Sequence, residues 1–167
     1  YFKLDVDINL NDKPWTPTKE FRGVFDGQHH KITGLKVSAA DEQVGLFGQL
    51  SRTGRLSNLH VSGDVENTKP SEYDCAGGIC GDNAIGVIAN CSFSGSVRGV
   101  GLVGGIAGEC NGKIISCKST ASVFGKYAGG IAGRNSSGKC SIYGCYNEGV
   151  IETEGGNAGG IYGKDDG

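Results

Sequence analysis

The sequence predicts an all-β fold, a parallel β-helix of about five to six coils, and three observations support this. A glycine-rich phrase recurs along the chain, a second phrase follows most copies of it, and no stretch of ten or more residues has helical periodicity. Measured from Gly45, Gly78, Gly105, Gly130 and Gly160, the steps between copies are 33, 27, 25 and 30 residues. Such a period is typical of stacked coils of about 25 residues, in which longer steps supply loops.

The glycine phrase combines small or branched apolar residues with one or two glycines and always ends on a glycine. Its five copies are Val44–Gly48, Ala76–Gly81, Val103–Gly108, Ala128–Gly133 and Ala158–Gly163. Glycine supplies 31 of the 167 residues but proline only 3, which excludes collagen and disfavours a disordered linker. We expect the phrase glycines to mark corners where φ is positive or two backbones approach closely.

The second phrase predicts strands that stack in parallel about 4.8 Å apart, with each aligned position forming a ladder inside the coil. The predicted columns are Ile32/Leu56/Ile88/Ile114/Ile142, Leu35/Leu59/Cys91/Cys117/Cys145 and Gly63/Gly95/Ala121/Gly149. The cysteines of the second column are expected to be small buried residues with free thiols.

We expect a single β-solenoid module over residues 1–167. Residues 1–20 form an opening strand and the first coil, residues 21–43 a first repeat-like coil, and residues 44–167 the glycine-phrase repeats. Apolar residues alternate with polar ones from Phe2 to Leu10, which predicts one half-buried strand with Trp15 packed nearby. The chain contains no methionine and opens with no signal segment, so we expect it to be excised from a longer chain.

The two phrases together resemble the GLUG repeat. Val103–Gly108 and Cys145–Val150 are the closest matches, and the segments Leu4–Leu10, Trp15–Pro17 and Phe21–Gly27 resemble what precedes such repeats in bacterial surface proteins. Lys118 and Ala121 depart from the pattern, which prefers tyrosine and glycine there. The resemblance implies a right-handed β-helix in large secreted or wall-attached proteins, including adhesins and the non-catalytic part of IgA-specific metallopeptidases.

Composition argues against several partners. The net charge is −2 and the isoelectric point about 5.9, so no basic footprint for nucleic acid is expected. The apolar runs are far shorter than the roughly 18 residues of a membrane span, so no membrane insertion is expected. We expect a monomer, although pairable strand edges at the two ends allow end-to-end association.

Residue patterns for cofactors, metals and catalysis are weak, and the sequence predicts none of these sites. Residues 99–104 match the pattern G-x-G-x-x-G, but no helical pattern follows, and the glycines belong to the repeat. Zinc would favour closer cysteine pairs. The seven cysteines cannot all pair, and a single disulfide involving Cys75, Cys80, Cys110 or Cys140 stays open. The acidic and histidine candidates for catalysis are Asp5, Asp7, Asp26, Asp41, Glu42, His29, His30 and His60, which form no recurring column.

Three loops collect the excess length of the longer steps, at 66–74, 134–139 and 152–157, and such loops in a solenoid often share one binding face. The loop that carries Lys69, Tyr73 and Asp74 is the best candidate for contact with a host protein or glycan. We therefore expect a non-catalytic structural or adhesive segment of an extracellular, bacterial cell-surface protein, acting as a stiff spacer or a loop-presenting surface. The alternatives are the accessory region of a large secreted metallopeptidase and, third, a carbohydrate-active β-helix.

Overall fold

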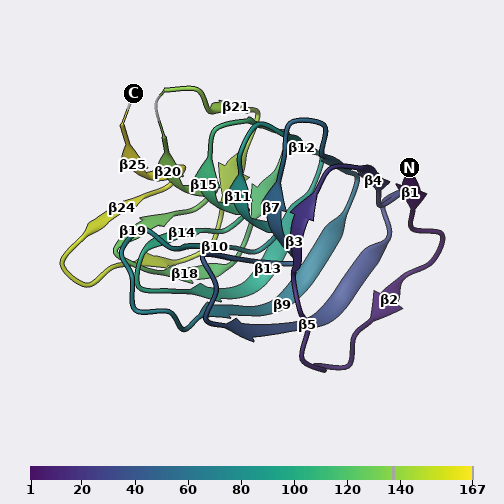
Figure 1. Cartoon of the computed structure of the whole chain (residues 1–167), viewed down its shortest axis with the longest axis horizontal. Coiled ribbons are helices and arrows are strands. Elements are labelled where there is room, and N and C mark those ends of the chain that lie inside the picture. Colours follow the sequence, from purple (N-terminus) through teal and green to yellow (C-terminus); the bar gives the residue numbers. More distant parts are fainter. Residues whose placement is uncertain (137, 167) are drawn as a thin grey trace.

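The computed structural model describes residues 1–136 and 138–166, and within these ranges the chain is all β, without a helix. Its short strands stack in parallel as a β-solenoid of about six turns, which confirms the predicted fold class (Figure 1). The strands form four parallel sheets, which we call A, B, C and D, and each full turn passes through them in the order A, B, D and C. For example, β8, β9, β10 and β11 make up one turn.

Sheets A and C each contain six strands, one from each turn. Sheet A consists of β1 (Phe2–Lys3), β4 (Val24–Asp26), β8 (Arg55–Ser57), β12 (Val87–Ala89), β16 (Lys113–Ile115) and β21 (Ser141–Tyr143). Sheet C consists of β3 (Thr18–Phe21), β7 (Phe47–Leu50), β11 (Cys80–Asn83), β15 (Ala107–Cys110), β20 (Ala132–Asn135) and β25 (Tyr162–Asp165).

Sheet B has the longest strands, and the strands of sheet D are two or three residues long. Sheet B consists of β2 (Ile8–Asn9), β5 (Lys31–Ala39), β9 (His60–Asn67), β13 (Ser92–Arg98), β17 (Lys118–Ser119), β18 (Ser122–Phe124), β22 (Tyr146–Asn147) and β23 (Ile151–Glu152). Sheet D consists of β6 (Gln43–Val44), β10 (Cys75–Gly77), β14 (Leu102–Gly104), β19 (Tyr127–Gly129) and β24 (Asn157–Gly159).

The core is a set of ladders of like apolar side chains, because parallel in-register stacking repeats the same inward position in every turn. In sheet B the ladder Val37, Val65, Val97 and Val123 is buried and ends at the half-buried Ile151. In sheet A, Leu56, Ile88 and Ile114 are fully buried and pair in register.

Two of the predicted columns need correction at their first member. In sheet A the residue that pairs with Leu56 is Phe25, which also pairs with Phe2, whereas Ile32 pairs with Val61 in sheet B. Leu35 pairs with Gly63, beyond a register irregularity that starts at Ile32. In the second turn the link between β4 and β5 is longer than the equivalent link between β8 and β9. Ile32 and Leu35 therefore do not stack on Leu56 and Leu59.

The opening segment is not one strand. Phe2 pairs with Phe25 in sheet A and Ile8 pairs with Ile32 in sheet B, so the segment turns the corner between two sheets. Only Leu4 is buried between these strands, and Val6 is exposed. The expected contact of Trp15 is present, since its indole N–H donates to the carbonyl of Leu46 at 2.9 Å.

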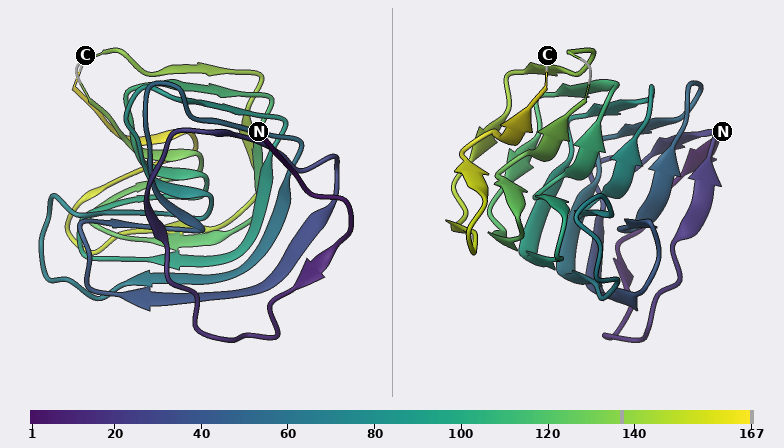
Figure 2. Two further views of the ribbon diagram at one scale, coloured as in Figure 1. Left: turned by 45° about the vertical axis from the view of Figure 1, so that its right-hand side comes forward. Right: turned by 60° about the vertical axis from the view of Figure 1, so that its left-hand side comes forward.

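The glycine phrase forms the hinge between sheets D and C, which fold in toward the middle of the coil (Figure 2). A Cβ at Gly104 would overlap the carbonyl oxygen of Ala107 and lie 2.8 Å from the Cα of Ala132. A Cβ at Gly108 would lie 2.6 Å from the amide nitrogen of Ala76, in sheet D of the preceding turn. The phrase therefore needs glycine for close backbone approach rather than for positive φ.

Candidate binding surface

Five consecutive turns place a loop at the same corner, where sheet B leads into sheet D. We call this set the loop corner, and it consists of residues 40–42, 68–74, 99–101, 125–126 and 153–156. In the left view of Figure 2 these loops lie at the lower left, beyond the ends of the long strands of sheet B. Stacking of the turns thus turns five short links into one continuous surface.

The buried side chain of Asn67 holds the base of the largest of these loops. Its amide group donates to the carbonyl of Asp41 at 2.8 Å, and its side-chain oxygen accepts the backbone N–H of Lys69 at 3.0 Å. Asn67 therefore ties the loop both to itself and to the loop of the preceding turn. These two hydrogen bonds hold in place the point at which the residues after Asn67 leave the strand.

Of the three predicted loop residues, the structure brings two together. The Lys69 ammonium lies 3.4 Å from the buried Asp74 carboxylate and 3.8 Å from Glu42 of the preceding turn. The Tyr73 side chain is 75% exposed. Lys69 and Asp74 thus hold the loop together, and Tyr73 is the exposed member of the three.

The surface is hollowed on both sides of Val100, which is 48% exposed. One hollow, of about 360 Å³, lies between Glu72 and Glu154, with Phe124 and Lys126 in its wall. The other, of about 440 Å³, is lined by Glu66, Asn67, Thr68, Arg98, Gly99, Val100 and Phe124. Lys126 forms an ion pair of 2.6 Å with Glu72, which joins two turns at this corner and raises the pKa of the lysine.

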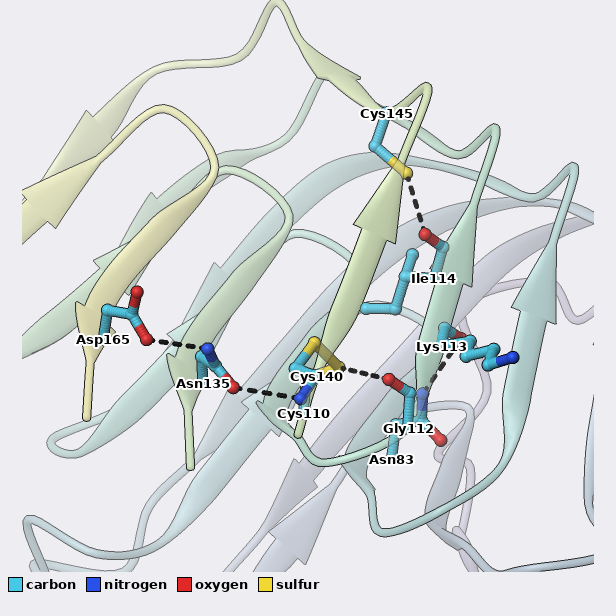
Figure 3. Close-up of a disulfide and its surroundings, with 9 residues drawn as sticks. All are labelled: Asn83, Cys110, Gly112, Lys113, Ile114, Asn135, Cys140, Cys145 and Asp165. Atoms are coloured by element: carbon cyan, nitrogen blue, oxygen red, sulfur yellow. Dashed lines mark hydrogen bonds between the residues drawn. A yellow bond between two sulfur atoms is a disulfide. The ribbon is translucent and has the colours of Figure 1, made fainter. Parts of the chain in front are cut away.

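The three long loops do not share one corner. The loops at 66–74 and 152–157 belong to the loop corner, but 134–139 joins sheet C to sheet A. Ser137 lies outside the described residues. A disulfide between Cys110 and Cys140, with Cα atoms 5.4 Å apart, pins the end of this loop to the preceding turn (Figure 3). Cys140 also donates its backbone N–H to the side chain of Asn135 at 3.1 Å.

The acidic candidates at the N-terminal end have structural contacts. Asp26 accepts the backbone N–H of Gln28 and the side-chain amide of Asn58, both at 3.0 Å, and the Asn58 contact is the main reason why its pKa is lowered. Asp5 accepts from the Gln28 side chain at 2.9 Å. Asp7 accepts the backbone N–H of Lys31, which is the largest cause of its lowered pKa.

The histidines are not gathered into one site. His30 contacts the Asp7 carboxylate at 3.0 Å, and the rings of His29 and His60 are 6.4 Å apart. His60 Nδ1 lies 2.8 Å from the hydroxyl of Ser92 on the next turn. Sequence reasoning missed this pair because the two residues occupy equivalent positions 32 residues apart with unlike side chains.

Sequence reasoning also missed a row of polar residues on sheet C. Each member directly follows the last glycine of the phrase or its equivalent, so extending the repeat alignment by one position would have found it. The row, which we call the polar ladder, is Glu20, Gln49, Asp82, Glu109, Arg134 and Lys164. It faces sheet D, since the Cys75 thiol lies 3.7 Å from Glu109 and Lys164 lies over the ring of Tyr127.

Within the polar ladder, Asp82 carries a buried carboxylate that hydrogen bonds satisfy only in part. It accepts from Gln49 at 2.8 Å, but its other oxygen is buried without a partner among the described residues. Burial, followed by the neighbouring Glu109 carboxylate, raises the pKa of Asp82 to about 6. Glu109 in turn pairs with Arg134 at 2.9 Å. At neutral pH the ladder therefore holds a buried carboxylate whose charge is poorly compensated.

The remaining five cysteines are free, as expected for the three that stack in one column. The Cys117 backbone N–H donates to the Cys145 sulfur at 3.3 Å, and Cys91 lies on the other side. The Cys145 contact lowers the pKa of Cys117, but contact with Cys91 and burial outweigh it and raise this pKa to about 12. The Cys117 thiol therefore stays protonated at neutral pH. Among the described residues, no group of three His, Cys, Asp or Glu side chains is arranged to hold a metal ion.

Residues 99–104, the apparent nucleotide loop, run through a bend into strand β14 (Leu102–Gly104), and no helix follows in the described part of the chain. The described residues also contain no helix that is long and apolar enough to span a membrane. Neither observation adds a further site to the loop corner and the polar ladder.

Comparison with known proteins gives one distant relative. The chain is 32% identical over 105 residues to halomucin of Haloquadratum walsbyi, and the match covers 62% of this chain but 1% of halomucin. No protein-family model matches the chain, so the resemblance to the GLUG repeat has no support from a family match. No solved structure matches it either. The chain is thus a β-solenoid repeat region with distant similarity to a small part of halomucin.

Proposed function

We propose that this chain is a non-catalytic β-solenoid segment of an extracellular surface protein, which works as a stiff spacer and presents the loop corner to a partner. The observation that carries this proposal is the stacking of five loops at one corner, on bases that are fixed by hydrogen bonds. Six turns at about 4.8 Å each give a rod about 25 Å long.

Two further findings support an extracellular setting. The Cys110–Cys140 disulfide is of the kind that persists in oxidising compartments. The similarity is to a protein whose name denotes a mucin, and mucins coat cell surfaces. The similarity to halomucin favours a surface role over the accessory region of a secreted metallopeptidase, whereas the disulfide fits both.

The loop corner has the features of a protein-binding patch. Tyr73 and Val100 are exposed, and polar and charged side chains line the two hollows beside Val100, which resembles the usual arrangement of apolar anchors inside a polar rim. Because the base of the loop is ordered by Asn67, contact with a partner would cost little ordering entropy.

The test is binding of the fluorescently labelled chain to animal cells and to surfaces coated with matrix proteins. We expect Tyr73→Ala and Val100→Ser each to reduce binding about fivefold or more. Tyr143→Ala is the matched control, because Tyr143 is 62% exposed on sheet A, away from the loop corner. If all three variants bind as well as the natural chain, the loop corner does not present a binding site, and only the proposed spacer role remains.

A further inference from the structure

A second surface feature lies on the outer face of sheet B, apart from the loop corner. It is a groove of about 390 Å³ between strands β5, β9 and β13, which are the longest in the protein. Strands β9 and β13 pair in register over their whole contact, and β5 joins them at Lys31 and Ile32 before its register irregularity, so outward side chains repeat along the solenoid axis about every 4.8 Å. The outward residues that line the groove are Lys31, Thr33, His60, Ser62, Ser92 and Ser94.

The chemistry of this groove differs from that of the loop corner. Its polar lining consists of hydroxyl groups, the Lys31 ammonium and the His60 imidazole, without a carboxylate among the described lining residues. The hollows of the loop corner, by contrast, are lined by Glu66, Glu72 and Glu154. A groove that offers an ammonium and an imidazole and has no carboxylate in its lining favours an anionic ligand.

The carboxylates near the groove have partners of their own, and Asp64, two residues beyond Ser62 on β9, accepts from the Ser96 hydroxyl at 2.6 Å. At the N-terminal end, Asp7 accepts the backbone N–H of Lys31 and contacts His30. Toward the C-terminal end, Lys118 pairs in register with Ser92 and extends the basic row, while its ammonium is held by Glu148 at 2.7 Å.

The hydroxyl groups form a second row beside the basic one. Ser62 and Ser94 pair in register, Thr33 lines the groove on the preceding strand, and Thr120 follows on the next turn. A hydroxyl can both donate and accept, so such a row matches a ligand that carries many hydroxyl groups. The repeat along the axis suits an extended polymer that crosses the strands.

We propose that this groove binds an acidic polysaccharide, a chain of sugars that carry carboxylates. Lys31 and His60 contact the carboxylates, and the hydroxyl row contacts the sugar hydroxyls. This site is separate from the loop corner, so it goes beyond the proposed presenting function and can fail independently of it.

The experiment is electrophoresis of the folded chain in native gels that contain polygalacturonate, neutral dextran or no polymer. We expect polygalacturonate to retard the chain and dextran not to. Lys31→Gln should weaken the apparent affinity about three- to tenfold, while Lys139→Gln, with the same change of charge on the 134–139 loop, should not. Ser94→Val should weaken it as well, whereas Ser122→Val, on the same sheet outside the groove, should not.

Three results would overturn the proposal. The first is a lack of retardation by polygalacturonate. The second is an equal loss of apparent affinity in Lys31→Gln and Lys139→Gln, which would show that the retardation depends on net charge rather than on the groove. The third is equal retardation by double-stranded DNA in the gel, which would indicate unselective anion binding.

Discussion

Sheet B and the hinge between sheets D and C pack the same six turns in opposite ways. In sheet B, side chains such as Val65, Phe93 and Val97 fill the interior and stack on their equivalents in neighbouring turns. In the hinge, glycines bring backbone against backbone, and no room exists for a Cβ at Gly104 or Gly108. A solenoid can thus close a sharp corner by removing side chains where two of its sheets must touch.

The difference teaches where each region tolerates change. A side-chain core loses stability when a group is removed, because a cavity remains. A glycine hinge loses stability when a group is added, because the neighbouring atoms belong to the backbone and cannot move aside.

The largest effect is expected for Phe93→Ala in sheet B. Phe93 is 1% exposed and packs beside Gly78 of the hinge, so its loss should lower the free energy of unfolding by about 4 kcal/mol. Urea denaturation measures this loss. Phe124→Ala removes the same group from a partly buried site at the end of β18, next to the loop corner, and should cost less than about 2 kcal/mol. Equal losses would show that the interior of sheet B is not the packed core.

The next effect concerns the disulfide that ties the hinge strand β15 to the loop before β21. Replacing both Cys110 and Cys140 by serine should lower the free energy of unfolding by about 3 kcal/mol, because the bridge closes a loop of 30 residues. Thermal unfolding with and without a reductant checks this. The reductant should lower the melting temperature of the natural chain and leave that of the double variant unchanged. An unchanged melting temperature in both would contradict the bridge.

A smaller effect is expected from Asp82, where the polar ladder meets the hinge. Its pKa of about 6 in the folded chain lies above the value of 3.8 for an exposed aspartate, so the folded state binds more protons between these values. Stability therefore falls as the pH rises from 4 to 7, by on the order of 2 kcal/mol.

Urea denaturation across this pH range measures the slope. Asp82→Asn keeps an oxygen that can accept from Gln49 and should remove the fall. Asp64→Asn is the control, since Asp64 is exposed on sheet B and accepts a hydrogen bond from the Ser96 hydroxyl at 2.6 Å. A slope that persists in Asp82→Asn, or disappears in Asp64→Asn, would assign the effect to another group.

The fold was predictable from sequence because the repeat fixes it at many positions at once. The columns around Ile88, Cys117 and Gly95 hold, since each position is constrained by neighbours above and below. The first turns deviate because Phe25 and Ile32 belong to turns with few neighbours, where link lengths vary. The alternation from Phe2 to Leu10 misled for the same reason, since pattern alone does not show that a segment turns a corner.

The binding surfaces were less predictable. The loop around Tyr73 stands out by its length, and its exposure follows from the excess residues. The polar ladder and the His60–Ser92 pair depend on which unlike residues stack on adjacent turns. Nothing in the amino-acid composition indicates such pairs. They can be found only when the register between turns is known, and this register depends on the lengths of the loops in each turn.

The central claim is that the phrase glycines serve close backbone packing in the hinge, and a matched pair of variants tests it. Gly105 and Gly160 occupy the same position of the phrase, but a Cβ at Gly105 would overlap Ser119 and the carbonyl of Gly130, whereas a Cβ at Gly160 would meet nothing within 4 Å. In urea denaturation, Gly105→Ala should lose about 2 kcal/mol or more, and Gly160→Ala less than about 1 kcal/mol. Equal losses in the two variants would contradict the account.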